Sequence, residues 1–239
     1  MTPAERASAV AFALKNCAIE AMTPSEPVMD YCMRYEQGDV DSADLVRFAD
    51  EQGASHRDAV FARTVRLAEQ GWEPSGGLDE LVAIHRRLYD DVFDDAGELR
   101  TSANERRGAD TSIVFFPASL IETGAANIAS ELEELHELRG LDRPDVIDAL
   151  AHIYDELGYL HPFVGGNAAV LRMFISRLTH AAGWDLDWGL VNRDEYEQAK
   201  HLAYHGDTSG FHAMFDRIAR PANPSRVFLV AGWDQGPAH

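Results

Sequence analysis

The sequence is poor in cysteine and in long apolar runs, and both shortages exclude classes of protein. Its 239 residues include only two cysteines, Cys17 and Cys32, and one pair cannot define a disulfide framework. Both lie among apolar neighbours in segments with helical periodicity, which predicts free, buried thiols. No apolar run is long enough to cross a membrane, and the first residues lack the basic and apolar stretches of a secretory leader. We therefore expect a soluble, cytoplasmic protein.

Basic residues are also scarce relative to acidic ones. There are 21 lysines and arginines against 40 aspartates and glutamates, which gives a formal net charge of -19 at pH 7. Such a field repels nucleic-acid backbones and anionic lipid surfaces, and we see no basic run longer than Arg106-Arg107. We expect neither a nucleic acid nor a membrane as partner, and the sequence leaves a homo-oligomer open. A bound nucleotide would require basic residues concentrated at its site.

Helical periodicity dominates the remaining pattern and divides the chain. Thr2–Glu5 forms a capping box with proline at the first helical position. Residues 1–70 then show short amphipathic helices, none of which buries its apolar face alone. Pro74–Gly77 is the clearest break. We expect a small N-terminal helical module over residues 1–70, a main domain over 78–222 and a tail over 223–239.

One segment departs from the helical pattern. Residues 101–117 lack a helical period, and Ile113–Phe116 is the single strand-like run, flanked by turn residues and Pro117. We expect Ile113, Val114 and Phe115 to form a short β-hairpin flap. The predicted fold class is therefore all-α with one small hairpin.

A glycine-containing loop, His161–Asn167, joins two strongly apolar helices, and we call it the signature loop. Gly165 and Gly166 allow a tight turn. The helix that follows points its first N–H groups at the loop, and together with the helix dipole they favour an anion. Asn167 is placed to cap that helix, and Arg172 lies within reach of an anion near its start.

A histidine opens the signature loop. We expect Pro162 to hold His161 in an extended conformation, and a histidine beside an anion site can act as a general base. From the residues alone, a plain turn with a structural histidine stays open as the alternative. Two other histidines, His85 and His152, are typical of ordinary helical positions.

The loop and the arginine after it resemble the signature of the Fic family, His-Pro-Phe-x-(Asp/Glu)-Gly-Asn-Gly-Arg-x-x-Arg, set between two core helices. Three further matches support the resemblance: Ile84–Phe93 with Ala96–Arg100 as the first family block, Phe116–Ala118 as the end of the flap, and Ala182–Trp188 after the signature helix. The resemblance covers roughly residues 78–222. It implies the Fic fold.

Fic proteins typically transfer AMP from ATP to a protein hydroxyl. The resemblance implies that His161 is the catalytic base, that ATP or another phosphate-containing nucleotide is the donor, and that a protein or small-molecule hydroxyl is the acceptor. It assigns supporting roles to the loop residues Pro162 and Phe163. Nucleotide and phosphate binding fall to Gly165, Gly166, Asn167, Ala168 and Arg172.

Three departures from the family signature weaken this assignment. Gly165 stands where the magnesium-binding carboxylate belongs, Ala168 replaces a glycine, and Ala169 replaces the first arginine. Magnesium prefers carboxylate and phosphate oxygens, and transfer depends on positioning and charge neutralisation. We therefore expect no metal site in the loop and much reduced ATP-dependent transfer. His201 and His205 have metal-ligand spacing but no obvious third ligand.

The N-terminal segment resembles a second family element. Some Fic proteins carry an inhibitory helix with Ser/Thr-x-x-x-Glu-Gly/Asn, whose glutamate pairs with the second signature arginine. In Asn16–Ala21 only Glu20 matches this pattern. The resemblance implies an antitoxin-like segment fused to the Fic domain, with Glu20 bound to Arg172. A solvated carboxylate at a helix end is the alternative.

Three hypotheses about function remain. The chain is an autoinhibited Fic-type transferase with weakened chemistry, a pseudoenzyme that serves as a binding or regulatory module, or a Fic-derived enzyme that uses His161 on a small molecule. Retention of His161 in its apolar frame favours an active site. The losses at Gly165 and Ala169 favour the other two hypotheses.

Overall fold

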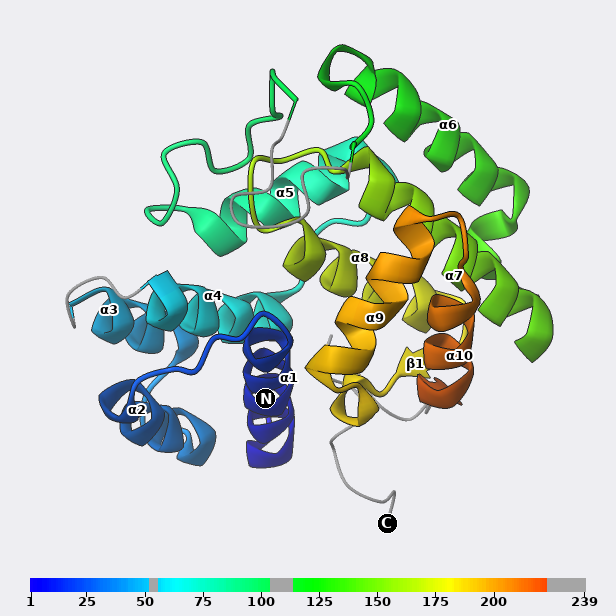
Figure 1. Ribbon diagram of the computed structural model, residues 1–239. Helices are drawn as coiled ribbons and strands as arrows, with labels where there is room; N and C mark the ends of the chain where they lie inside the picture. The colour runs from blue at the N-terminus through cyan, green and yellow to red at the C-terminus, as the bar shows by residue number, and fades with distance from the viewer. Residues whose placement is uncertain (52–55, 104–113, 223–239) are drawn as a thin grey trace.

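The computed structural model describes residues 1–51, 56–103 and 114–222 (Figure 1). These ranges form ten α-helices, three short 3-10 helices and one two-stranded sheet, so the predicted helical fold class is confirmed. Within them, no helix combines the length and the apolar character that a membrane crossing requires. Ile113 of the predicted flap and the tail 223–239 lie outside the described residues.

Four helices form the N-terminal part of the chain. They are α1 (Pro3–Ile19), α2 (Glu26–Gln37), α3 (Ser42–Glu51) and α4 (His56–Gln70). α1 begins at the predicted capping box, since the Thr2 hydroxyl accepts the Glu5 N–H and the Glu5 carboxylate accepts the Thr2 N–H. Cys17 of α1 and Cys32 of α2 are free and buried, as predicted.

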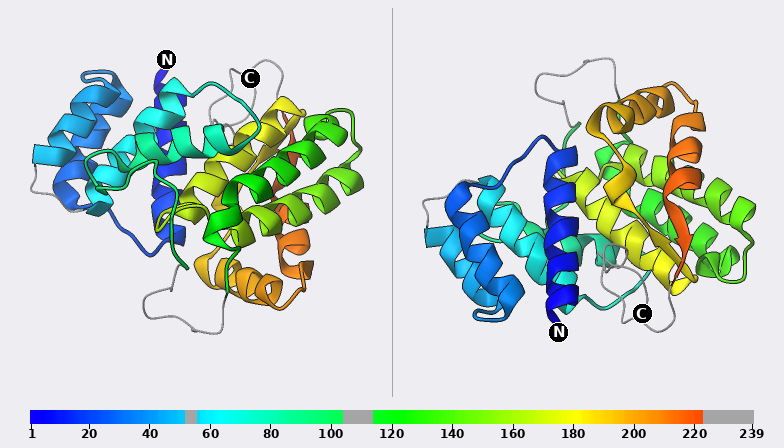
Figure 2. Two further views of the ribbon diagram at one scale, coloured as in Figure 1. Left: turned by 90° about the horizontal axis from the view of Figure 1, so that it is seen from above. Right: turned by 90° about the horizontal axis from the view of Figure 1, so that it is seen from below.

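The position of α1 links the two parts of the molecule. It packs along α2 and α4, and it also contacts α9 and the 3-10 helix η3 (Trp188–Leu190) of the second part. In all views of Figures 1 and 2 it lies between α2–α4 and the helices that follow α5. The C-terminal end of α1 is thereby brought to the core of the second part.

Six longer helices build that second part. They are α5 (Leu78–Tyr89), α6 (Ile121–Glu134), α7 (Arg143–Leu160), α8 (Asn167–Ala181), α9 (Arg193–Tyr204) and α10 (Ser209–Ile218). α7 starts at the N-cap residue Asp142, whose side chain accepts the Asp145 N–H at 3.2 Å. α8 is central: every residue from Ala169 to Thr179 is buried, and the helix packs against α5 and α7. The signature loop joins α7 to α8.

A buried carboxylate fixes the connection between the two parts. Glu80 of α5 is 1% exposed and forms a two-pronged ion pair with Arg177 of α8, at 2.8 and 2.6 Å. It also accepts hydrogen bonds from the Trp72 indole and from the N–H groups of Ser75 and Gly76. The linker after α4 is therefore held against the start of α5 and the middle of α8.

The small sheet does not involve the predicted flap. Its strands β1 (Trp184–Leu186) and β2 (Ala219–Pro221) pair antiparallel beside α8. Val114–Phe116, the described part of the flap segment, is in no strand. The Phe116 N–H instead donates to the carbonyl of Tyr159 in the last turn of α7 at 3.0 Å. This end of the segment is thus fastened to a helix, and η1 (Ala118–Leu120) follows it.

Candidate active site

His161 ends α7 in a left-handed conformation, with φ 43° and ψ 62°. The prediction of an extended conformation before Pro162 is therefore wrong. His161 continues the helix as its C-cap, with its N–H donating to Leu157 at 3.2 Å, and this local bond outweighs the preference of a residue before proline. A left-handed backbone conformation is uncommon for a residue with a side chain. Such strained conformations cluster at functional sites.

Arg100 holds the backbone of His161 in that conformation. This arginine is 3% exposed, and it donates to the carbonyls of His161 at 2.5 Å and Leu160 at 3.1 Å and to that of Phe116. The backbone N–H of Arg100 donates to the Pro162 carbonyl oxygen at 2.9 Å. Arg100 lies in the family block Ala96–Arg100, but no role for it was predicted from the sequence. The block itself was the available signal.

The imidazole of His161 lies between the flap segment and a cavity. It stacks on Phe115, with ring centroids 3.8 Å apart and planes 14° apart. Together with Asn167 and Ala168 it lines a cavity of about 60 Å³, which Asp155 of α7 and Lys200 of α9 also line. Phe115 is buried, whereas Val114 before it is 76% exposed. His161 thus meets both an internal space and a segment that reaches the surface.

Asn167 closes the signature loop on itself. Its side-chain oxygen accepts the Phe163 N–H at 3.0 Å, and its side-chain nitrogen donates to the Phe163 carbonyl at 2.8 Å. The prediction that Asn167 caps α8 is wrong, because these bonds occupy its amide and the cap is Gly166, with φ +75°. The N-cap residue Gly166 offers no side-chain hydrogen bond to the first N–H groups of α8, which suits an anion at this helix start.

Helix α5 supports the other side of the loop. Nε2 of His85 lies 3.1 Å from the Gly165 carbonyl oxygen. The imidazole stacks on the Phe163 ring, with ring centroids 3.9 Å apart. The Tyr89 ring lies so close to Gly166 that a Cβ there would be 2.3 Å from Cε2. Only glycine fits at position 166. His85, predicted to be an ordinary helical histidine, is therefore a residue of the candidate site.

Arg172 is buried on α8 at 1% exposure and is held by α1. Its Nε donates to the Asn16 side chain at 2.5 Å, and Nη2 donates to Glu20 Oε1 at 2.8 Å. The predicted Glu20–Arg172 ion pair is therefore present. Burial alone would lower the pKa of Arg172, but Glu20 together with Tyr196 and Tyr154 outweighs it, so the net shift is upward. Nη1 is buried and has no hydrogen-bond partner among the described residues.

The signature loop lacks the side-chain carboxylate with which the family signature would hold a magnesium ion. Gly165 has no side-chain oxygen, and its carbonyl already accepts from His85. Ala169 is 2% exposed and contributes no charge. Over residues 1–51, 56–103 and 114–222, no group of three histidine, cysteine or acidic side chains is placed to hold a metal ion.

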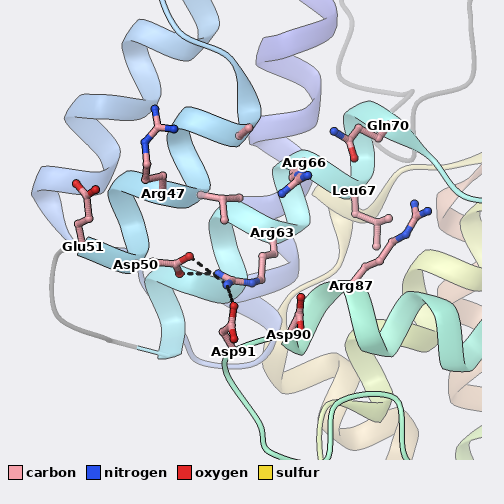
Figure 3. A pocket seen from close by; sticks show the side chains of 12 residues that line it. Arg47, Asp50, Glu51, Arg63, Arg66, Leu67, Gln70, Arg87, Asp90 and Asp91 are labelled. Atoms are coloured by element: carbon pink, nitrogen blue, oxygen red, sulfur yellow. Dashed lines mark hydrogen bonds and ion pairs between the residues drawn. The ribbon is translucent and has the colours of Figure 1, made fainter.

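A larger cavity of about 730 Å³ lies away from His161, between α3, α4 and the end of α5 (Figure 3). Arg63 points to its centre, where it bonds both carboxylate oxygens of Asp50 and lies 4.0 Å from Asp91. This cavity is lined by four arginines and four acidic residues, so its lining carries no net charge: Arg47, Arg63, Arg66, Arg87, Asp50, Glu51, Asp90 and Asp91. None of the signature-loop residues borders it.

Comparison with known proteins identifies the fold and the loop. Residues 76–179 match the Fic/DOC family. The chain is 33% identical over 175 residues to a probable protein adenylyltransferase Fic of Escherichia coli (strain K12), covering 73% of this chain and 84% of that protein. It is 37% identical over 171 residues to a probable protein adenylyltransferase Fic of Salmonella typhimurium, covering 72% and 82%.

A solved structure gives the same result for the fold. The BepC protein of Bartonella tribocorum, a crystal structure with bound AMPPNP, matches with a TM-score of 0.63 and 21% identity, over 74% of this chain and 89% of that one. The chain belongs to the Fic/DOC family. The family resemblance read from the signature loop is thereby confirmed.

Proposed function

We propose that this chain is a Fic-type transferase that moves the AMP part of ATP to a hydroxyl group of a protein, and that α1 holds it in an inhibited state. The observation that carries the proposal is that His161 and the start of α8 line one cavity, while the buried Arg172 lies further along the same helix and is held by Glu20. Two relatives that the chain matches over most of their length are named probable protein adenylyltransferase Fic.

His161 serves as the general base in this proposal. It accepts the proton of the acceptor hydroxyl, whose oxygen then bonds to the α-phosphorus of the donor while the bond to the bridging oxygen breaks and pyrophosphate leaves. The stack on Phe115 and the bonds from Arg100 to the backbone fix the direction of the imidazole. Such positioning is the main contribution that a protein makes to transfer of this kind.

The start of α8 and Arg172 would hold the phosphates. Uncapped N–H groups at a helix start bind anions, and a guanidinium binds phosphate oxygens with two parallel hydrogen bonds. Arg172 Nη1 is a buried donor with no described partner, which is costly unless a ligand satisfies it. A phosphate oxygen is the acceptor that this position suits.

Glu20 supplies the inhibition. It occupies Nη2 of Arg172, so a phosphate that needs this guanidinium must displace it. The cavity at His161 measures about 60 Å³, well below the roughly 300 Å³ and more of ligand pockets. Both features suit a closed state. We assign residues 1–70 to an antitoxin-like inhibitory module, 78–222 to the Fic domain and 223–239 to a tail.

A specific observation favours the pseudoenzyme as the second candidate. The loop lacks the metal carboxylate at Gly165 and the first arginine at Ala169, so transfer in this chain takes place without a loop-bound magnesium or not at all. A binding module would keep the nucleotide affinity and lose the turnover.

The test separates binding from transfer. Calorimetry of ATP binding is performed on the wild-type chain and on Glu20→Gly, each with and without magnesium. The same chains are then incubated with ATP labelled in its α-phosphate, alone and with cell extract, and attached AMP is measured by mass spectrometry. The proposal expects ATP binding and label transfer by Glu20→Gly, with the transfer lost in Glu20→Gly/His161→Ala.

The outcomes decide between the two candidates. ATP binding without any label transfer in Glu20→Gly makes the chain a binding module. The absence of ATP binding in that variant contradicts both candidates and leaves the Fic-derived small-molecule enzyme.

A further inference from the structure

His85 has its protonation state fixed by two backbone groups. It is 1% exposed, and its Nδ1 lies 2.8 Å from the Gly97 N–H, which can only donate. Nε2 lies 3.1 Å from the Gly165 carbonyl, which can only accept. Nδ1 must therefore carry a lone pair and Nε2 a proton, since a neutral imidazole has one donor and one acceptor. The contacts select one tautomer of the uncharged ring.

The bond to Gly165 fixes the direction of the next peptide group. In a trans peptide the C=O and the N–H point to opposite sides, and the described residues contain no cis peptide. Because the Gly165 carbonyl faces His85 on α5, the N–H of Gly166 points away from α5. The Tyr89 hydroxyl oxygen lies 3.5 Å from the Gly166 carbonyl oxygen. By the same geometry, the N–H of Asn167 points away from Tyr89.

The side opposite α5 is the side of the cavity at His161. His161, Asn167 and Ala168 border that cavity together with residues of α7, α9 and α10, and α5 contributes none of its lining. The geometry points to His85 as a positioning residue that turns the Gly165–Gly166 peptide so that the Gly166 N–H donates to the phosphate of a bound nucleotide. This inference rests on the proposed function for the nature of the anion.

Two further features keep the imidazole in this role. Burial lowers the pKa of His85, although the bond to Gly165 and the nearby Asp95 carboxylate act in the opposite direction. The uncharged ring is the form that both hydrogen bonds require. Stacking on Phe163 fixes the ring plane, and Phe163 is itself bonded to Asn167.

Substitutions can separate this role from simple core packing. In His85→Gln the side-chain nitrogen lies near the Nε2 position and can donate to Gly165. In His85→Asn the side-chain oxygen lies near the Nδ1 position and can accept from Gly97, but the chain is too short to reach Gly165. His85→Phe keeps the ring and loses both bonds.

The first measurement is ATP binding by calorimetry in the Glu20→Gly full-length chain. We expect the Kd to rise about tenfold in His85→Asn and His85→Phe and about twofold in His85→Gln. Tm is measured for each variant. The inference predicts that Kd depends on whether the variant keeps a donor to Gly165. If the changes in Kd instead follow the changes in Tm across the three variants, the inference is overturned.

The second measurement needs no ligand and begins with the wild-type chain. Nitrogen-15 NMR of labelled histidine is expected to show His85 at neutral pH with Nε2 protonated and Nδ1 hydrogen-bonded. A charged ring or the Nδ1–H tautomer overturns the inference. The Gly166 amide proton shift should change in His85→Asn and stay near the wild-type value in His85→Gln.

The two measurements separate this inference from the proposed function. If Glu20→Gly binds no ATP, the proposed function fails, and the NMR result still decides how His85 orients the loop. If ATP binds but the Gly166 amide shift is the same in all variants, the positioning role fails alone.

Discussion

Glu20 and Arg172 are 152 residues apart in the sequence, and their carboxylate and guanidinium are 2.8 Å apart in the structure. The arginine is 1% exposed, whereas the glutamate side chain is 34% exposed. Solvent can thus reach the Glu20 carboxylate but not the Arg172 guanidinium. Removal of the acid leaves a buried cation without its counter-charge, and that cation is then available to an anionic ligand.

Glu20→Gly is expected to increase ATP affinity by about tenfold or more, because the guanidinium exchanges one carboxylate for phosphate oxygens. Without ligand, the variant should lose about 1–2 kcal/mol of stability, less than a fully buried pair would, because Glu20 is partly exposed. ATP calorimetry and urea unfolding measure the two effects. Asp30→Asn, which removes an exposed charge from α2, is the control and should change neither. Equal ATP affinity in Glu20→Gly and wild type would contradict the inhibitory role.

Gly165→Glu is expected to make ATP binding respond to magnesium. The backbone at Gly165 is not left-handed, and an added Cβ would lie 3.7 Å from Phe93, an ordinary contact, so the substitution should fold. Both chains carry Glu20→Gly. We expect magnesium to raise the ATP affinity of the Gly165→Glu chain and to leave the ATP affinity of the chain that keeps Gly165 unchanged, since only the carboxylate is a preferred magnesium ligand. Gly165→Gln has the same shape without the charge. A magnesium response in the glutamine variant would show that the carboxylate is not the ligand.

His85 should make the stability of the fold depend on pH. Burial lowers its pKa in the folded chain, so below the ordinary histidine pKa of about 6.5 the unfolded chain binds more protons than the folded one. Stability then rises with pH in this window: the contribution of His85 is present above about pH 6.5 and is lost as the pH falls towards the lower, folded pKa. Asp95 reduces the effect because its carboxylate favours the charged ring.

The measurement compares urea unfolding of wild type and His85→Gln between pH 7.5 and 5.5. Wild type should lose more stability over this range than the variant. Identical slopes would mean that the imidazole is not held in its uncharged form.

Glu80→Gln should destabilise the chain strongly. Glu80 is fully buried, and its partner Arg177 is 9% exposed, so the substitution leaves a buried guanidinium unpaired, at a cost of about 3–5 kcal/mol. Glu197→Gln, which breaks the partly exposed pair with Lys200, should cost less than about 1 kcal/mol. Urea unfolding of both variants tests the comparison, and losses of similar size would disprove the structural role of Glu80.

The candidate site was only partly accessible from the sequence. The signature loop could be placed between α7 and α8 because the apolar pattern and the glycines are local signals. The conformation of His161 and the role of Asn167 were predicted wrongly from local preferences. His161 is held by the bond of its N–H to Leu157 and by Arg100, which bonds its carbonyl. The amide of Asn167 is occupied by the backbone of Phe163.

The sequence alone accounts for the helical fold class, the starts of α1 and α7, and the position of the signature loop, since caps and periodicity act within a few residues. It also determined what the loop lacks, a carboxylate at Gly165 and a charge at Ala169. Which side chains surround the loop and the helix after it depends on tertiary packing. His85 and Arg100 contact the loop, and Asn16 and Glu20 contact Arg172 of α8, all from distant segments. Packing of α5 against α8, and of α1 against α4 and α9, buries apolar surface and brings these polar groups together.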